Sequence, residues 1–464
     1  MAQALRPYQQ EAVERLRAAF LAGHRAVLFV LPTGGGKTVV FCHIAQQAAE
    51  RGKRIAVLVH RAELLEQASR SLAALGVRHG LIAAGRAMNL AAPVQVASVG
   101  TLARRLPQLP ADLFALLVID EAHHSNAGQW SRIIQHFNAA HLLGVTATPV
   151  RSDGRGLGEF YSELVLGPSA AWLSANGFLA PARVFAPPSS FEAQRLRQRL
   201  GDYDLRQAAS ELGGARILGD AVSHYRQHLG DQTAIGFCCS VAHAQAVAAA
   251  FLEQGITAAC IDGSLDLGRR RQLLEQLGSS EIKVLTSCAL IGEGVDVPSV
   301  GGCLLLRPTQ SEALHLQMIG RCLRPQAGKQ AVILDHVGNI CRLGHHLEER
   351  HWTLKGASKR QRQPSLSVRT CPQCFCAMAS TTLRCPECGH QFRPEQRSYA
   401  VQPGQLQEVS ASELRQRRKR EQQEATNLEE LLAVGQRRGM KNPKGWARHV
   451  LAARQSKGRW GRLG

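Results

Sequence analysis

The sequence LPTGGGKT at residues 31–38 follows the apolar run AVLFVL at residues 26–31 and precedes a segment with helical periodicity. A buried strand, a glycine-rich turn and a helix in this order are the context of a phosphate-binding loop. The glycines would turn backbone amides toward phosphate oxygens, Lys37 would reach the β and γ phosphates, and the Thr38 hydroxyl would ligate Mg²⁺. The nucleotide-binding residues expected here are Thr33, Gly34, Gly35, Gly36, Lys37 and Thr38. An ordinary glycine-rich turn is the alternative.

Similar short apolar runs recur along the chain and alternate with longer helix-like segments. In the first half they are IAVLVH (55–60), ALLVID (115–120) and LLGVT (142–146). The pattern starts again after residue 230 with AIGFCC (234–239), TAACI (257–261), IKVLT (282–286), GCLLL (302–306) and AVILD (331–335). Strands that are buried on both faces of a parallel sheet have such continuous apolar sequences. The sequence therefore predicts an α/β protein with two parallel sheets in tandem.

Two adjacent carboxylates follow one of the predicted strands, in VIDEAHH at residues 118–124. At a strand end beside a phosphate loop, Asp120 would hold Mg²⁺ and Glu121 would orient and deprotonate the water that attacks the γ phosphate. A helix cap in which Asp120 accepts backbone amides is the alternative. The phosphate loop favours the catalytic interpretation.

Together these motifs resemble those of the superfamily 2 helicases, in particular the DEAH-type branch, and further motifs follow in the family's order from residue 5 to about 345. RPYQQEAV, LPTGGGKT, VHRAELLEQ, GVTATP and QMIGRCLRP more narrowly resemble the bacterial RadD-like and restriction-translocase-like (ResIII-type) helicases. The resemblance implies two RecA-like domains that bind ATP between them. It departs from the usual pattern at Gly100, where relatives tend to carry a polar residue.

The resemblance also assigns roles to residues of each motif. It implies an adenine pocket of Arg6, Tyr8 and Gln9, nucleic-acid contacts by Arg61 and Thr101, and coupling of hydrolysis to domain movement by Thr146 and Thr148. In the second half it implies that Gly294 and Asp296 join the nucleotide and nucleic-acid sites and that Gln317, Arg321 and Arg324 are catalytic. Arg321 and Arg324 are three residues apart, so they would share one helical face as a γ-phosphate clamp requires. Such a pair without the other motifs would usually be a solvated face.

A cysteine cluster sets the C-terminal region apart, because five of the 13 cysteines lie within residues 371–388. The knuckles CPQC (371–374) and CPEC (385–388) predict a zinc ribbon with Cys371, Cys374, Cys385 and Cys388 as the ligands of Zn²⁺. Cys376 and His390 are substitutes, and free thiols or a redox pair are the alternative. The domain organisation expected is an ATP-binding domain (1–168), a connecting segment (169–211), a second helicase domain (212–345), a basic segment with the zinc ribbon (346–400) and a basic helical tail (401–464).

Charge points to a polyanionic partner. The formal net charge of the 464 residues is +20, of which residues 341–464 carry 24 Lys and Arg against 10 Asp and Glu, or +14. Basic surfaces bind phosphates with release of counterions, although a tail that only aids solubility is the alternative. Trp446, among lysines and arginines, is a candidate for stacking on bases or for packing in its own helix. Neither a membrane span nor a secretion signal is evident, so a cytoplasmic location is expected.

The sequence thus predicts an ATP-dependent, nucleic-acid-stimulated helicase or translocase that uses ATP, Mg²⁺ and Zn²⁺. The narrower resemblance favours DNA over RNA and a role in repair or recombination, with repair-protein partners at the C-terminal region. The alternatives are a translocase that moves on duplex without unwinding, a noncatalytic zinc-dependent adaptor, and a phosphate-loop kinase. A kinase would leave the arginine pair without a role.

Overall fold

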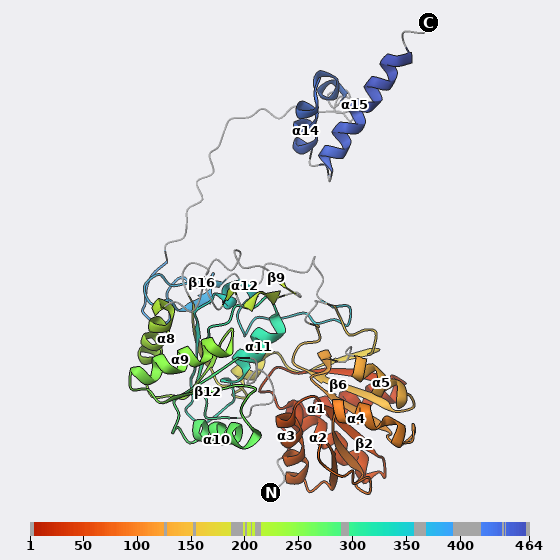
Figure 1. The fold of residues 1–464 in the computed structure, drawn as a ribbon, viewed down its shortest axis with the longest axis vertical. Coiled ribbons are helices and arrows are strands. Elements are labelled where there is room, and N and C mark those ends of the chain that lie inside the picture. The colour runs from red at the N-terminus through yellow and green to blue at the C-terminus, as the bar shows by residue number, and fades with distance from the viewer. Residues whose placement is uncertain are drawn as a thin grey trace. The chain divides into compact units, whose positions relative to one another are not determined.

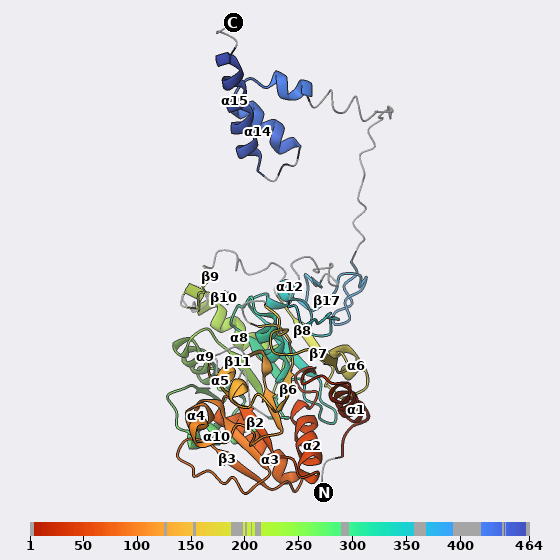
Figure 2. The same ribbon diagram turned by 90° about the vertical axis from the view of Figure 1, so that its right-hand side faces the viewer.

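The computed structural model describes residues 4–124, 128–151, 155–186, 198–199, 202–205, 207–208, 215–288, 297–356, 368–392, 419–438, 440 and 442–460. They belong to two compact units, residues 1–394 and 395–464, which are described separately (Figures 1 and 2). None of the helices in these described ranges is long and apolar enough to cross a membrane.

The first domain is built on a seven-stranded sheet with the strand order β3-β4-β2-β5-β6-β1-β7, in which every pair is parallel. Its elements in chain order are α1 (Pro7–Leu21), β1 (Ala26–Val30), α2 (Lys37–Glu50), β2 (Ile55–Val59), α3 (Ala62–Ala74), β3 (His79–Ile82), β4 (Val94–Ser98), α4 (Val99–Arg105), β5 (Leu116–Asp120), α5 (Gly128–His136), β6 (His141–Thr146) and β7 (Glu163–Leu166). Short 3₁₀ turns follow α4 (Leu106–Gln108) and β5 (Ala122–His124). α6 (Ala170–Ala175) follows the last strand.

Helices cover both faces of this sheet, which explains the continuous apolar strands. Along β1, Val27 and Phe29 join an apolar cluster with α1, α2 and α3, whereas Leu28 and Val30 join the cluster of α4 and α5. Side chains that alternate between two buried faces must all be apolar, and none of these four is more than 3% exposed.

The second sheet has six parallel strands in the order β12-β13-β11-β14-β15-β8. Its elements are β8 (Ala182–Phe185), α8 (Ala215–His228), β11 (Ala234–Phe237), α9 (Val241–Glu253), β12 (Ala258–Ile261), α10 (Leu267–Gly278), β13 (Val284–Ser287), β14 (Gly302–Leu305), α11 (Glu312–Gly320), β15 (Ala331–Asp335) and α12 (Asn339–Leu343). A two-stranded hairpin, β9 (Gln198–Arg199) and β10 (Asp202–Tyr203), precedes α8. The α/β prediction with two parallel sheets is confirmed. β8 lies within the predicted connecting segment but belongs to the second sheet, while the domain boundaries stay a prediction.

After α12 the chain crosses back to the first domain through residues 345–356, which we call the return segment. There the amide of Gly158 donates a 2.9 Å hydrogen bond to the carbonyl oxygen of Leu354, and Arg155 forms an isolated antiparallel bridge with Gly356. Trp352 and Leu354 pack against the apolar cluster of α4 and α5. Within the described residues the chain therefore crosses between the two domains after β7 and again after α12.

The cysteine-containing hairpin, β16 (Val368–Thr370) and β17 (Ala377–Ala379), then lies against the edge of the second sheet. The separate unit contains α14 (Leu428–Arg437) and α15 (Pro443–Trp460), which share a small apolar core of Ala425, Leu431, Val434, Ala447 and Val450.

Candidate nucleotide site and cysteine cluster

The loop between β1 and α2 has the backbone conformation that phosphate binding requires. Gly34 and Gly36 both have a φ of +87°, in the left-handed region that glycine adopts without strain. Gly36 is the residue immediately before α2, so the helix begins at Lys37 with the amides of its first turn facing the loop. A Cβ at Gly36 would lie 2.4 Å from Gln9 Nε2, so even alanine would not fit there without movement.

The start of α1 packs on this loop. The Tyr8 hydroxyl donates a 2.8 Å hydrogen bond to the Gly35 carbonyl oxygen, and Gln9 Nε2 donates to the same oxygen over 3.2 Å. The Arg6 amide donates to Gln9 Oε1 over 3.0 Å, and the Arg6 guanidinium lies 5.2 Å from the ring centre of Phe178. The structure thus brings the predicted adenine-pocket residues to the predicted phosphate loop. Phe178 was not predicted from the sequence.

Asp120 and Glu121 lie at the carboxyl end of β5, and they are only 5% and 7% exposed. Glu121 has a φ of +51°, a left-handed conformation that costs a non-glycine residue about 1–3 kcal/mol and is frequent at functional sites. Its amide donates a 3.0 Å hydrogen bond to Asp120 Oδ1.

His123 links Glu121 to the TATP motif. Its Nδ1 lies 3.5 Å from Glu121 Oε2 and 3.2 Å from the Thr146 hydroxyl, which also donates a 2.9 Å hydrogen bond to the Thr148 carbonyl oxygen. Thr146 and Thr148 are buried. His123 was not predicted as a site residue, although it lies within the quoted VIDEAHH sequence.

The second domain reaches the phosphate loop through the C-terminal end of α11. A Cβ at Gly320 would lie 2.4 Å from Thr33 Cβ, so the backbone of α11 is in direct contact with the loop. The next residue, Arg321, is 6% exposed, and Gln317 is 3% exposed. α11 ends at Gly320, so Arg321 and Arg324 lie on the turn after it, and the prediction that they share a helical face is wrong. Lys329 Nζ donates to the carbonyl oxygen of Arg324 over 3.0 Å and so fixes this turn.

The charges of both domains act on Lys37. Burial lowers the pKa of Lys37, the carboxylates of Glu121 and Asp120 act against this, and Arg321 and Arg324 lower the pKa further. Since Coulomb interactions of this kind need proximity, the predicted lysine, carboxylates and arginine pair all lie at one seam between the domains.

The buried polar atoms that make no hydrogen bond to another described residue include Thr33 Oγ1, Glu121 Oε2, Thr148 Oγ1 and Gln317 Nε2. Buried polar atoms are normally hydrogen-bonded, and a polar ligand bound at the seam would supply partners for these atoms. Glu121 Oε2 beside the Asp120 carboxylate is a fitting environment for a divalent cation, since buried carboxylates require positive charge.

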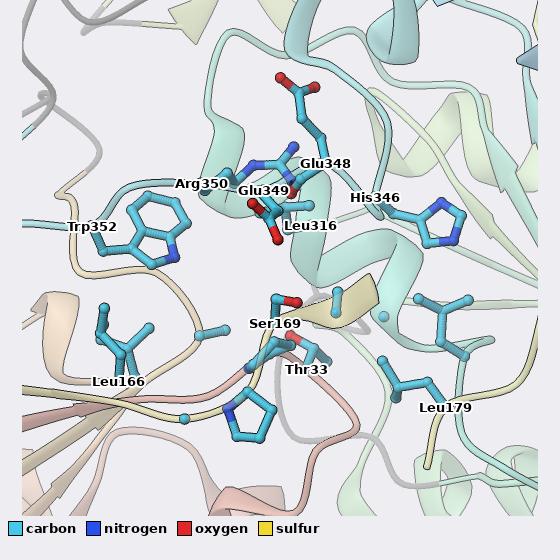
Figure 3. A pocket seen from close by; sticks show the side chains of 18 of the residues that line it. Thr33, Leu166, Ser169, Leu179, Leu316, His346, Glu348, Glu349, Arg350 and Trp352 are labelled. Carbon is cyan, nitrogen blue, oxygen red and sulfur yellow. Dashed lines mark hydrogen bonds between the residues drawn. The ribbon is translucent and has the colours of Figure 1, made fainter. Parts of the chain in front are cut away.

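A cavity of about 260 Å³ adjoins the phosphate loop (Figure 3). Thr33 and Ser169 contribute hydroxyl groups from the first-domain side. Leu316 of α11, together with Glu349 and Trp352 of the return segment, faces them. The cavity therefore lies between residues of both domains, and the return segment forms one of its walls.

The predicted nucleic-acid contacts are spread over the molecule. Arg61 precedes α3 and is half-buried, with its Nε 3.4 Å from His60 Nε2, while Thr101 is buried in α4. Trp446 is half-buried in the second unit, where the Arg438 guanidinium lies 5.7 Å from its ring centre. The roles of Arg61, Thr101 and Trp446 in nucleic-acid binding therefore stay predictions. Gly294 and Asp296 lie outside the described residues.

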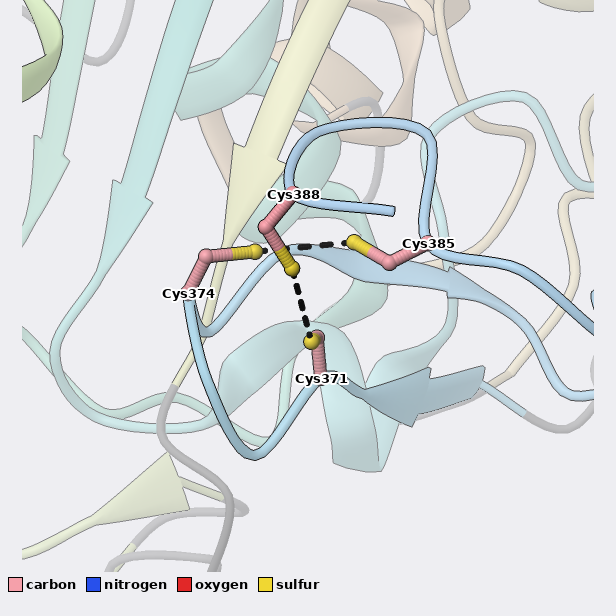
Figure 4. A group of neighbouring side chains, drawn as sticks. All are labelled: Cys371, Cys374, Cys385 and Cys388. Carbon is pink, nitrogen blue, oxygen red and sulfur yellow. Dashed lines mark hydrogen bonds between the residues drawn. The ribbon is translucent and has the colours of Figure 1, made fainter. Parts of the chain in front are cut away.

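The four predicted metal ligands form one cluster (Figure 4). Their sulfur atoms all lie within 4.8 Å of one another, with 3.6 Å between Cys371 and Cys388 and 3.5 Å between Cys374 and Cys385. A tetrahedral Zn²⁺ site with Zn–S bonds of ~2.3 Å requires sulfur separations of about 3.8 Å. The cluster is therefore compatible with zinc.

Comparison with known families and proteins agrees with this arrangement. Residues 3–151 match the family "Type III restriction enzyme, res subunit", and residues 216–326 match "Helicase conserved C-terminal domain". A Lactococcus phage protein known as "51.5 kDa protein" is 34% identical over 371 residues, which cover 79% of this chain and 78% of the phage protein.

Two further similarities concern larger proteins. IRC3 of Saccharomyces cerevisiae, provisionally named an ATP-dependent helicase, is 28% identical over 72% of this chain and 51% of its own length. The structure of the "ATP-dependent Type ISP restriction-modification enzyme LlaBIII bound to DNA" shares the fold with a TM-score of 0.56 and 18% identity over 73% of this chain and 28% of that one. The chain thus spans only about half of IRC3 and less of LlaBIII. It belongs to the superfamily 2 helicases of the restriction-translocase-like type, and it is an ATPase of that class.

Proposed function

We propose that this protein couples ATP hydrolysis at the domain seam to movement along DNA. The observation that carries the proposal is the direct contact of Gly320, which precedes Arg321, with Thr33 of the loop that carries Lys37. Asp120 and Glu121 are buried at the end of β5 in the same domain as this loop. Lys37, Arg321 and Arg324 together with two carboxylates suit a ligand that carries several negative charges, such as a nucleoside triphosphate with its cation. Thr33 Oγ1 and Gln317 Nε2, which are buried and make no hydrogen bond to another described residue, are compatible with a bound nucleotide.

Each residue then has a part in hydrolysis. The amides of the phosphate loop and Lys37 would bind the β and γ phosphates, with Tyr8 and Gln9 holding the loop from behind. Glu121 would orient the attacking water and accept its proton. Arg321 and Arg324 would stabilise the charge that develops on the transferred phosphoryl group.

Thr38 and Asp120 would hold Mg²⁺. Thr38 lies in the first turn of α2, directly after the phosphate loop, and Asp120 is one of the two buried carboxylates at the end of β5. When bound, Mg²⁺ neutralises phosphate charge and polarises the γ phosphate. Because His123 contacts both Glu121 and Thr146, a movement of Glu121 during hydrolysis would displace Thr146 and with it the segment that follows β6.

Movement would follow from the opening and closing of the seam. Binding of a nucleotide between Lys37 and the arginine pair stabilises the closed arrangement, and loss of the γ phosphate removes that stabilisation. If Arg61 and Thr101 on the first domain, with contacts on the second, grip the nucleic-acid backbone, each cycle shifts the grip. Gly294 and Asp296 would link the two sites, as the family resemblance implies.

DNA is proposed over RNA because LlaBIII was solved bound to DNA and the first family match is to a restriction enzyme subunit. The proposal also includes strand unwinding and a role in DNA repair or recombination. It further includes a cytoplasmic location and repair-protein partners that bind the C-terminal region. A translocase that moves on duplex without separating strands is the second candidate, favoured by the restriction-enzyme similarity. Zn²⁺ bound to the four cysteines would fix the module on the second domain.

The test is ATP turnover measured without nucleic acid and with single-stranded, forked and duplex DNA and the matching RNAs. We expect stimulation by DNA, and loss of at least ~10²-fold of the rate in Lys37→Ala and Glu121→Gln. Lys53→Ala, which removes an exposed lysine from the same domain, is the matched control. Tight DNA binding without stimulated turnover would contradict the proposal and favour a noncatalytic adaptor. Strand-displacement and triplex-displacement assays then distinguish unwinding from duplex translocation.

A further inference from the structure

Residues 178–186, which we call the β8 segment, touch the nucleotide seam at their N-terminal end. A Cβ at Gly34 would lie 2.8 Å from Leu179 Cδ2, so the Leu179 side chain packs directly on the phosphate loop. The Ala180 amide donates a 2.8 Å hydrogen bond to the carbonyl oxygen of Leu323, which lies between Arg321 and Arg324. Leu179 and Ala180 are 1% and 4% exposed. This end of the segment is thus fixed to both sides of the seam.

The other end of the β8 segment is fixed to the cysteine module. The Arg183 guanidinium donates two hydrogen bonds to Glu387, with Nε 2.8 Å from Oε1 and Nη2 2.6 Å from Oε2. The Ala186 amide donates a 3.0 Å hydrogen bond to the Phe375 carbonyl oxygen. Phe375 directly follows the first cysteine knuckle and Glu387 lies within the second, so contacts at both knuckles hold the segment.

β8 is an edge strand, and this makes the module important for its position. Among the strands that the structure describes, it pairs within the sheet only with β15, from Ala182 opposite Ala331 to Phe185 opposite Leu334. An edge strand with one neighbour depends on other contacts for its stability. Here the bridge between Phe185 and Cys376 and a shared apolar cluster with Cys371 and Cys385 supply them. A displacement of the module would therefore move β8.

We propose that Arg183 is a positioning residue for ATP hydrolysis, through which the cysteine module sets the distance between the arginine pair and the phosphate loop. An extended segment transmits a displacement along its length, and Arg183 is only three residues from the amide that binds Leu323. Arg183 itself touches neither nucleotide nor metal in this scheme. The inference rests on the proposed nucleotide site.

The test is a charge exchange measured by steady-state ATP turnover with the full-length protein. We expect Arg183→Glu and Glu387→Arg each to lower kcat about five-fold with a change in KM below about two-fold, because the arginine pair acts on the transition state. The double variant Arg183→Glu/Glu387→Arg should recover kcat to within about two-fold of the unmodified protein. Bound zinc, measured by metal analysis, should stay equal in all four proteins.

Arg226→Glu is the matched control, because Arg226 is an exposed arginine of the same domain whose hydrogen bonds go to Gln254. Thermal unfolding of each variant identifies any that fails to fold. Unchanged kcat in the folded single variants, or no recovery in the folded exchange variant, would overturn the inference. If the unmodified protein hydrolyses no ATP at all, the proposed function fails instead.

Discussion

Substitution of Gly320 by alanine should separate the arginine pair from the phosphate loop. The added methyl carbon would lie 2.4 Å from Thr33 Cβ and 2.5 Å from Thr33 Cγ2. Nonbonded carbon atoms need ~3.5–4.0 Å, so the C-terminal end of α11 must withdraw by about 1 Å. Arg321 follows directly in the chain and moves with it. A misplacement of about 1 Å in a catalytic arrangement costs on the order of 10²-fold, which corresponds to about 2.7 kcal/mol in the barrier.

The measurement is kcat for ATP under saturating DNA, together with the thermal midpoint of unfolding. We expect kcat to fall about 100-fold in Gly320→Ala while the midpoint stays close to that of the unmodified protein, because a small rotation between the domains relieves the contact. Gly278→Ala is the control, since its added carbon would lie 3.8 Å from Val297, at an ordinary contact distance. A kcat within two-fold of normal in Gly320→Ala would refute the contact between α11 and Thr33 as a requirement for hydrolysis.

Three further predictions concern the histidine link, the cysteine module and a buried histidine. His123→Ala should lower kcat about ten-fold, and adding Thr146→Val should lower it little more, because the two residues act in one chain of contacts. Cys374→Ser, or removal of metal by a chelator, should lower the midpoint of thermal unfolding of the unit formed by residues 1–394 by more than about 5 °C. The reason is that a metal ion bound by the folded module, and not by the unfolded chain, adds its binding free energy to the stability of the fold. Burial lowers the pKa of His315 to about 3, below its value of ~6.5 in the unfolded state. Below about pH 6.5 the unfolded state therefore binds more protons than the folded state, and the free energy of unfolding decreases as the pH is lowered. Between pH 7 and 5 this loss is about 2 kcal/mol, and His315→Met should be spared it in urea titrations at the two pH values.

Each of these three predictions can be contradicted directly. Additive effects of the His123 and Thr146 substitutions would show that they act independently. A midpoint that is unaffected by chelation, with metal release verified, would show that the module does not support the second domain. Equal pH dependence in His315→Met and the unmodified protein would show that other groups cause the loss.

The sequence predicted the central strands and the seam residues because their patterns are local. A strand buried on both faces must be continuously apolar, as in residues 26–31 and 55–60, and a phosphate loop must combine glycines with Lys37. The cluster of four cysteines could be predicted equally well, since each knuckle is a short motif. The function that these motifs indicate is confirmed at the level of the family.

What the sequence did not reveal depends on distant partners. β8 has four residues, of which Ala182 and Arg183 are only partly buried, so it lacks the continuous apolar pattern of the other strands. The return segment has no periodicity, and its contacts with residues 155–158 lie about 200 positions earlier in the chain. The link through His123 depends on where β6 ends relative to β5, and that register is a property of the folded sheet.

The second chain crossing has a mechanical consequence for the domain seam. Two domains that are joined by one flexible segment can rotate relative to each other about three axes. A second connecting segment at a distance from the first leaves mainly rotation about the line that joins the two segments. Among the described residues the connections are the segment after β7 and the return segment, whose Trp352 and Leu354 are embedded in the first domain. Opening of the seam should therefore follow one defined arc, and Arg321 should return to the same place beside Lys37 at every closure.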